Sequence, residues 1–160
     1  MSRIDGQVRG ATTRIRILCA DTDMMGVVYY AGYLRFFEAG RVDLLRMAGM
    51  AYPDIEALFG VRLPVVEIQA RYSRPAGYDD ELTLNTTIGA VGAASVRFDY
   101  RIERGAALIA SGHTTHAAID GRGKPRRLPS ELAHRLHPFL LPQVHPRACG
   151  RPSAGIRGPQ

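Results

Sequence analysis

The residues best suited to chemistry lie in one stretch, residues 21–41, which reads DTDMMGVVYYAGYLRFFEAGR. The stretch begins as a short acidic loop that contains a glycine. It continues as a helix with apolar residues at spacings of three and four. Carboxylates stand at Asp21 and Asp23, and we expect the helix to begin near Tyr30. A carboxylate beside a helix N-terminus can act on a polarised carbonyl, because the first N–H groups of a helix have no partner within it.

Thioester hydrolysis is one reaction that such a loop could perform. It requires a carboxylate that attacks the carbonyl or activates water, and a donor for the developing oxyanion. Asp23, three residues before Gly26, can supply the carboxylate. A backbone N–H near Tyr30 can supply the donor, assisted by the helix dipole. A structural role in the turn is the alternative for Asp23, whereas we expect Asp21 to brace the loop as a hydrogen-bond acceptor.

The elements that must position this loop are one long helix and a sheet. Residues 11–19 alternate like a strand with one buried face, which would carry Thr13, Ile15, Ile17 and Cys19. The long helix is expected to end at Gly49, and a short second helix to run from Pro53 to Gly60.

From Leu63 onward the apolar period changes to two, which predicts a series of strands. The predicted strands span residues 63–75, 81–91, 92–103 and 107–120. On the second strand the residues expected to face the core are Leu82, Leu84, Thr86 and Ile88. On the third they are Ala94, Val96, Phe98, Tyr100 and Ile102. One long helix followed by antiparallel strands predicts an α+β fold with the sheet packed on that helix.

Length and composition predict one globular domain over residues 1–138. A short helix is expected near its end, with Ser130 as the N-cap. Residues 139–160 are rich in Pro, Gly and Arg and predict a disordered tail. No apolar run reaches the ~20 residues that span a bilayer, and the N-terminus lacks the apolar core of a secretory signal. We therefore expect a cytoplasmic protein without membrane insertion.

The net charge of +6 is local, and it argues against a nucleic-acid partner. Residues 1–119 contain thirteen Lys/Arg and thirteen Asp/Glu, whereas residues 120–160 contain eight basic and two acidic side chains. A neutral body with one basic patch suits a small phosphorylated ligand, and a merely solvated basic segment is the alternative. Cysteines and histidines form no ligand cluster, so no metal or redox cofactor is expected.

A family resemblance sharpens these expectations. Residues 21–33 resemble the motif D-x-D-x-x-G-x-V-(Y/W)-x-x-x-Y of the 4-hydroxybenzoyl-CoA thioesterase family of hotdog-fold enzymes, nearest to its Tol-Pal-associated branch. RYSRPAGYDDELTLNT and GKPRRLP resemble later segments of the same family, and the similarity covers residues 12–136. The resemblance implies a hotdog fold, in which an antiparallel sheet wraps around one long central helix and two subunits pair their sheets around the active sites.

The same resemblance implies an acyl-CoA thioesterase in which Asp23 is the nucleophile or general base. The loop and helix residues implied to contact substrate are Gly26, Val28, Tyr29 and Tyr33. Glu67 would act behind them or face solvent. For coenzyme A the resemblance points to Ser95 and Arg97 and to the basic turn with Lys124, Arg126 and Arg127. Dehydratases of this fold place a His five residues after the Asp, where this chain has Val28.

Two questions stay open on the residues alone. A non-catalytic module that binds acyl-CoA or acyl carrier protein, or a Tol-Pal-type scaffold, is the alternative to an enzyme. A homo-oligomer, either a dimer or a tetramer built from dimers, is expected because the predicted sheet leaves an edge strand open.

Overall fold

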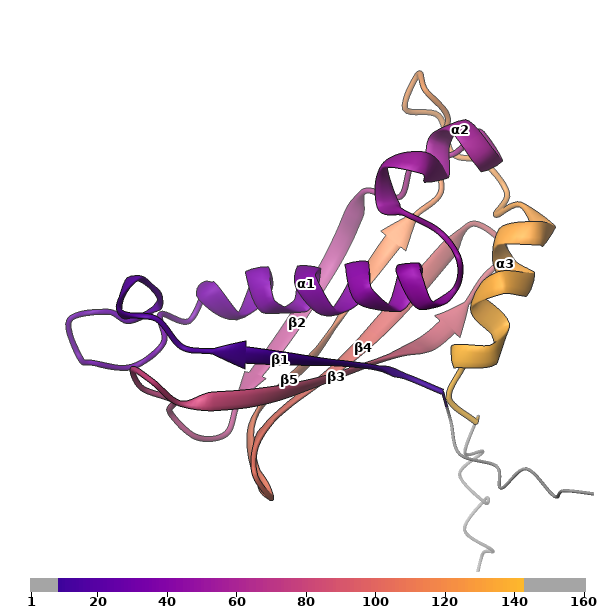
Figure 1. Cartoon of the computed structure of the whole chain (residues 1–160). Helices are drawn as coiled ribbons and strands as arrows, with labels where there is room; N and C mark the ends of the chain where they lie inside the picture. The colour runs from indigo at the N-terminus through magenta and orange to yellow at the C-terminus, as the bar shows by residue number, and fades with distance from the viewer. Residues whose placement is uncertain (1–8, 143–160) are drawn as a thin grey trace, which may run out of the picture.

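The computed structural model describes residues 9–142, which form an α+β domain around one antiparallel sheet (Figure 1). The sheet has five strands in the order β1-β3-β4-β5-β2. Their bounds are Ala11–Arg16 (β1), Val65–Tyr72 (β2), Glu81–Val91 (β3), Ser95–Arg104 (β4) and Ala107–Ala117 (β5). The α-helices are Gly32–Met47 (α1), Ile55–Phe59 (α2) and Ser130–Leu136 (α3). The predicted α+β class is therefore confirmed.

Alternation along the strands forms the core as the sequence predicts. On β3 and β4 the expected inward faces are buried, from Leu82 through Ile88 and from Val96 through Ile102. Two inward predictions at strand ends are wrong. Cys19 is exposed because the chain leaves β1 after Arg16 and turns through a 3-10 helix. Ala94 is exposed because it lies in the turn before β4.

Helix α1 crosses one face of the sheet and packs mainly over β1, β3 and β4. Its buried side chains include Phe37 and Leu44. Gly40 allows the close approach, because a Cβ there would collide with the side chains of Thr86 and Leu84 on β3. The helix thus lies close to β3 at Gly40, and its larger side chains fill the space between it and the rest of the sheet.

The two ends of the molecule differ. The loop between β1 and α1 lies at one end, on the left in Figure 1, and α2 and α3 lie at the other. Residues 118–128 form a turn at the α2 end, where Arg126 N–H donates to Ala118 O at 2.9 Å and Leu128 N–H donates to Ala93 O at 2.8 Å. The predicted acid–base loop and the predicted basic turn therefore stand at opposite ends of the sheet.

The chain after β5 stays packed on the sheet beyond residue 138, where the sequence predicted the domain to end. Phe139 is buried, and Leu141 N–H donates to Ile88 O at 2.9 Å. The N-cap of α3 is Pro129, so the predicted capping role of Ser130 is wrong. Most of the predicted tail, residues 143–160, lies outside the described residues. Between residues 9 and 142 there is no helix long and apolar enough to cross a membrane.

Candidate active site

Asp21 anchors the loop that precedes α1. Its carboxylate is 8% exposed, accepts a hydrogen bond from Leu18 N–H at 2.8 Å and forms an ion pair with Arg35 of α1. Its carbonyl accepts from Tyr29 N–H at 3.0 Å. These contacts join the two ends of the loop to the helix, so the prediction that Asp21 braces the loop is confirmed.

Asp23 stands at the start of the tight turn that this brace supports. Gly26 N–H donates to Asp23 O at 2.9 Å, and Asp23 N–H donates to Val27 O at 2.9 Å. Gly26 has φ +76°, a conformation that residues with a side chain rarely adopt. One carboxylate oxygen, Oδ1, accepts from Met25 N–H at 2.8 Å. The other, Oδ2, has no hydrogen-bond donor among residues 9–142 and is free to meet a ligand.

A cavity of about 380 Å³ opens beside Asp23. The loop and α1 contribute Asp23, Val28, Tyr30 and Tyr33 to one wall, and residues 72–75 at the end of β2 form the other. Four of the residues predicted from the sequence thus share one cavity. Gly26 shapes the adjoining turn and does not line it.

The N–H of Tyr30 is the best candidate for an oxyanion donor. In the described part of the chain neither Tyr30 N–H nor Ala31 N–H donates to a backbone acceptor, whereas Tyr29 and Gly32 both do, and of the two only Tyr30 lines the cavity. Tyr72 OH donates to Tyr30 O at 2.8 Å and holds this peptide to the end of β2. Helix α1 begins at Gly32, two residues later than predicted, so this N–H belongs to the turn before the helix.

The three tyrosines of the loop and helix have different surroundings. Tyr33 is 3% exposed, its ring centre lies 5.3 Å from that of Tyr72, and burial raises the pKa of its phenol. Tyr29 is 46% exposed and lies outside the cavity. A hydrogen bond with Tyr30 raises the pKa of the Tyr29 phenol. Both phenols are therefore neutral at pH 7, and Tyr33 is a wall of the cavity while Tyr29 is not.

The predicted coenzyme A ligands lie away from this cavity within one chain. Ser95 pairs with Ala117 at the α2 end of the sheet, and the side chains of Lys124, Arg126 and Arg127 are exposed on the nearby turn. Arg97 forms an ion pair with Asp99 at 2.9 Å and lines a shallow groove on the outer face of the sheet. Glu67 is exposed on β2 and accepts from Thr115 Oγ1 at 3.1 Å. No single subunit brings these groups to Asp23.

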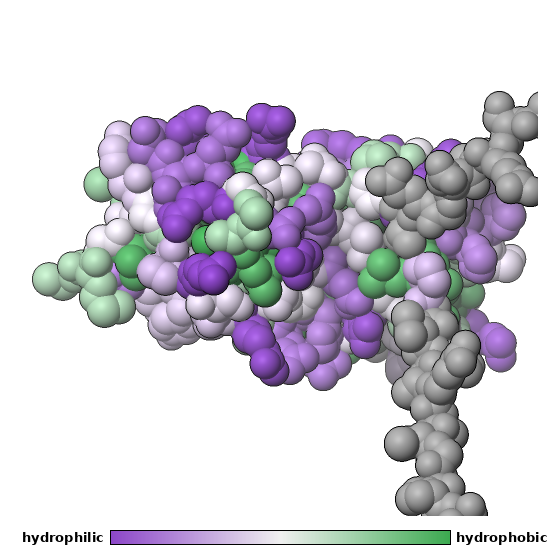
Figure 2. All heavy atoms as spheres, turned by 90° about the horizontal axis from the view of Figure 1, so that it is seen from below, coloured by the Kyte–Doolittle hydropathy of each residue, from purple (hydrophilic) through white to green (hydrophobic). Residues whose placement is uncertain are grey.

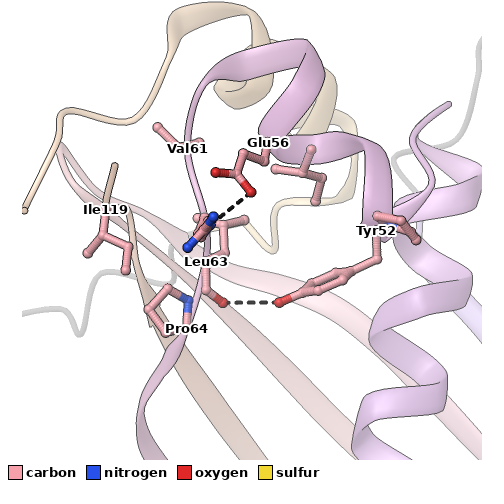
Figure 3. A pocket seen from close by; sticks show the side chains of 9 residues that line it. Tyr52, Glu56, Val61, Leu63, Pro64 and Ile119 are labelled. Carbon is pink, nitrogen blue, oxygen red and sulfur yellow. Dashed lines mark hydrogen bonds and ion pairs between the residues drawn. The ribbon is translucent and has the colours of Figure 1, made fainter. Parts of the chain in front are cut away.

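A second cavity, of about 350 Å³, lies at the α2 end of β2 (Figure 3). Its walls are mostly apolar, with Val61, Leu63 and Ile119 among them. An ion pair joins Glu56 to the neighbouring Arg62 at 2.8 Å, and Tyr52 OH donates to Leu63 O at 3.3 Å. This cavity suits an apolar group that enters from the edge of the sheet.

Sequence reasoning missed the contribution of β2 to the first cavity. Tyr72, Ser73 and Arg74 line it, and Tyr72 also positions the Tyr30 peptide. The segment RYSRP that contains them supported the family resemblance, but no pattern within it indicates that its end meets the loop before α1.

Asp23 and Tyr30 line one cavity in the loop before a helix that packs on an antiparallel sheet, and this arrangement of helix and sheet is that of a hotdog fold. The comparison with known families agrees. The chain belongs to the thioesterase-like superfamily, whose family model matches residues 17–136.

Individual relatives span most of the chain. It is 30% identical over 129 residues to the acyl-CoA thioesterase YbgC of Haemophilus influenzae, which covers 80% of this chain and 95% of that protein. It is 34% identical over 107 residues to the putative acyl-CoA thioesterase YneP of Bacillus subtilis, covering 66% of this chain and 77% of that protein. The crystal structure of the hypothetical protein TT1821 from Thermus thermophilus superimposes with a TM-score of 0.76 and 34% identity, covering 84% of this chain and 100% of that one.

Proposed function

We propose that this protein hydrolyses acyl-CoA thioesters to the free acid and coenzyme A, with Asp23 as nucleophile or general base. The observation that carries the proposal is that the unpaired Oδ2 of Asp23 and the unpaired N–H of Tyr30 adjoin the same cavity. Membership of the thioesterase-like superfamily and the similarity to acyl-CoA thioesterases of Haemophilus influenzae and Bacillus subtilis support it.

In the proposed reaction the thioester carbonyl lies between Asp23 and the N–H of Tyr30. The N–H donates to the oxygen as negative charge develops on it, while the carboxylate attacks the carbon or takes a proton from the attacking water. The leaving group is the thiolate of coenzyme A, which is a weak base compared with an alkoxide. The reaction therefore needs no general acid at the sulfur, and the acids in the cavity are accordingly few.

The site is proposed to be completed by a second subunit that pairs through β2. This strand is an edge of the sheet, and its side chains Val65, Val66 and Ile68 are 42%, 61% and 47% exposed. An edge strand with exposed apolar residues is expected to pair with another chain. A strand that pairs with its own copy about a two-fold axis normal to the sheet runs antiparallel. The sheet of such a dimer would wrap around both α1 helices.

In such a dimer, the predicted coenzyme A ligands of one subunit would lie near Asp23 of the other. Within one chain, Tyr72 at the cavity and Val65 at the other end of β2 are about 23 Å apart at 3.3 Å per residue. Antiparallel pairing would bring the Val65 end of one subunit, with its basic turn, beside the Asp23 loop of the other. We propose that Ser95, Arg97, Lys124, Arg126 and Arg127 bind coenzyme A in this way, across subunits.

Further proposals come from the sequence. They are membership of the Tol-Pal-associated branch, assembly of dimers into a tetramer, a cytoplasmic location, no metal or redox cofactor, and acyl carrier protein as a second possible carrier. Residues 1–138 with the adjoining packed segment would form the single hotdog domain.

A panel of thioesters tests the function. Purified protein is mixed with short aliphatic, long aliphatic and aryl CoA esters, and release of the free thiol is followed. Turnover of at least one class is expected. A protein that binds the esters, as measured by calorimetry, without releasing thiol would instead be the non-catalytic module.

A further inference from the structure

The core of the protein contains a positive charge without a counterion. Arg41, on α1, is 7% exposed, and its Nε has no hydrogen-bond partner. None of the ion pairs found among residues 9–142 includes it. Arginine is almost never buried unless it is paired, because an unpaired charge loses its hydration. Something outside the described chain is therefore expected to supply an anion.

The groups around this guanidinium are all neutral. Its carbon lies 5.8 Å from the ring centre of Tyr52. Burial raises the pKa of Tyr100, which Arg41 partly opposes, so the phenol stays protonated. Burial, together with the Arg41 charge, lowers the pKa of His116 to about 4, so the imidazole is neutral at pH 7.

Those polar neighbours already bond to one another. Tyr100 OH shares a hydrogen bond of 2.7 Å with Thr114 Oγ1, which is 2.9 Å from His116 Nε2. His116 Nδ1 is 2.8 Å from Leu63 O. The chain of hydrogen bonds satisfies these groups and offers no carboxylate to Arg41.

One face of α1 connects the wall of the first cavity to this charge. Tyr33, Phe37 and Arg41 lie on one face of α1, at intervals of four residues, so Arg41 is about 12 Å along the helix axis from Tyr33 in the cavity wall. Facing them, Ile68 pairs with buried Thr114 and Tyr72 pairs with buried Ala110, which places both side chains on the helix side of β2.

This side of β2 is only half covered. Ile68 and Tyr72 are each 47% exposed, because α1 packs over the opposite half of the sheet. These half-exposed side chains form a strip along β2 that runs from Tyr72, in the wall of the Asp23 cavity, toward Leu63, whose carbonyl is met by Tyr52 OH and His116.

We propose that Arg41 binds a carboxylate at the far end of the acyl group, so that the preferred substrates are CoA thioesters of medium-length dicarboxylic acids. This inference rests on the proposed thioesterase function, which fixes the near end of the acyl group at Asp23. The methylenes lie along the strip, and the guanidinium supplies paired N–H donors that match a carboxylate. A neutral acyl chain of the same length leaves the buried charge unpaired and is selected against.

Two thioesters matched in length provide the test. Initial rates are measured for decanoyl-CoA and for the CoA monothioester of decanedioic acid. The wild-type kcat/KM is expected to be at least about tenfold higher for the dicarboxylic thioester. In Arg41→Met, which removes the charge and keeps an unbranched, flexible apolar side chain, this preference is expected to vanish or reverse. Arg46→Met is the control, because Arg46 lies on the same helix and is exposed.

A second measurement is independent of turnover and of the variant's folding. Free decanedioate should raise the Tm of the wild-type protein, and decanoate at the same concentration should raise it less. Equal or faster hydrolysis of decanoyl-CoA by wild type would overturn the inference while leaving the thioesterase function intact. Loss of turnover with both esters, together with a halved mass in Arg41→Met, would also overturn it, since the anion would then be a carboxylate of a second subunit. If wild type hydrolyses no thioester at all, the proposed function itself fails.

Discussion

Two carboxylates in one loop differ in what surrounds them, and that difference separates their roles. Asp21 is buried, accepts a hydrogen bond from Leu18 N–H and forms an ion pair with Arg35. Asp23 is partly exposed, and one of its oxygens is bound by Met25 N–H while the other is open to the cavity. A carboxylate committed to its own loop is a poor reactant, and this is why we propose Asp23 and not Asp21 as the reacting group.

Asp23→Asn should therefore remove the chemistry and keep the fold. We expect kcat to fall on the order of 10³-fold, the usual effect of losing an acid–base group or nucleophile, with little change in Tm or in binding of a CoA ester. Asp21→Asn should cost less activity and more stability. Asp54→Asn, an exposed carboxylate at the start of α2, is the control. Wild-type turnover by Asp23→Asn would refute the mechanism.

His116 should make the protein less stable in mild acid. Its pKa is about 4 in the folded protein, chiefly because of burial, and about 6.5 when the chain is unfolded. Between these values the unfolded chain binds more protons, so the free energy of unfolding decreases as the pH falls from about 6.5 to 4, by up to about 1.4 kcal/mol per pH unit. Urea titrations across this range should show the slope. It should be smaller in His116→Gln and unchanged in the exposed control His134→Gln.

Among the elements, the turn from Asp23 to Gly26 has the most specific conformational demand. It closes with an N–H to O bond of 2.9 Å between its ends, and Gly26 is left-handed. The turn also projects Met24 and Met25, which are 105% and 80% exposed, and apolar atoms are visible at this end of the molecule in Figure 2. Because its own hydrogen bonds hold the turn, Asp23 is positioned although Met24 and Met25 at the tip are exposed.

Gly26→Ala should separate backbone strain from catalysis when compared with Gly105→Ala. Both glycines have positive φ, +76° and +58°, and a Cβ at either would meet no atom within 4 Å. Each substitution should cost about 1–2 kcal/mol of stability, measured by urea unfolding. Only Gly26→Ala is expected to lower kcat as well, because Gly105 lies in the β4–β5 hairpin. An equal loss of kcat in both variants would mean that the Asp23 turn is not specifically required.

Strand β2 is the element on which assembly depends. Val66→Lys should prevent its pairing, because a buried charge at the centre of an interface is strongly unfavourable. Light scattering should then show half the mass of the wild-type assembly. Leu58→Lys on α2 is the control, since Leu58 is 56% exposed and Val66 is 61% exposed. A wild-type mass for Val66→Lys would exclude pairing through this edge.

At the scale of the whole molecule, a shared active site predicts complementation between two defective chains. In Asp23→Asn the carboxylate is lost, and in Arg126→Gln/Arg127→Gln the phosphate contacts are lost, which should raise KM for CoA esters but not for pantetheine esters. A co-expressed mixed dimer has one site with both defects and one site with neither. At substrate concentrations below the wild-type KM, the mixture should therefore be more active than either parent.

The same experiment identifies the alternative. If each site belongs to one chain, the mixed dimer contains one site without Asp23 and one with a high KM, and low-substrate activity stays at the level of the parents. In the control, Asp23→Asn is co-expressed with Arg14→Gln/Arg46→Gln, because these two arginines are exposed and lie outside the basic turn that contains Arg126 and Arg127.

The sequence by itself determined the local structure and pointed to Asp23 and Tyr30, which the structure places at one cavity. A period of two over residues 81–103 places Leu84 and Phe98 inward whatever lies around them, because successive side chains of a strand alternate between its faces. Asp23 and Tyr30 are close in the chain, so the loop that joins them is enough to bring them together. The predictions from sequence that are wrong, such as those at Cys19 and Ser130, concern the ends of helices and strands, where periodicity is no longer informative.

Which residues are exposed at the edge of the sheet depends on the order of the strands, and only the tertiary structure shows that order. The apolar pattern of β2 is the same for a central or an edge strand, and its position beside β5 alone leaves Val66 and Ile68 exposed. Likewise, Arg41 reads as one more charged residue on an amphipathic helix until packing against Tyr52 and Tyr100 buries it. Contacts between residues far apart in the chain follow from how whole elements pack, and no local period encodes that packing.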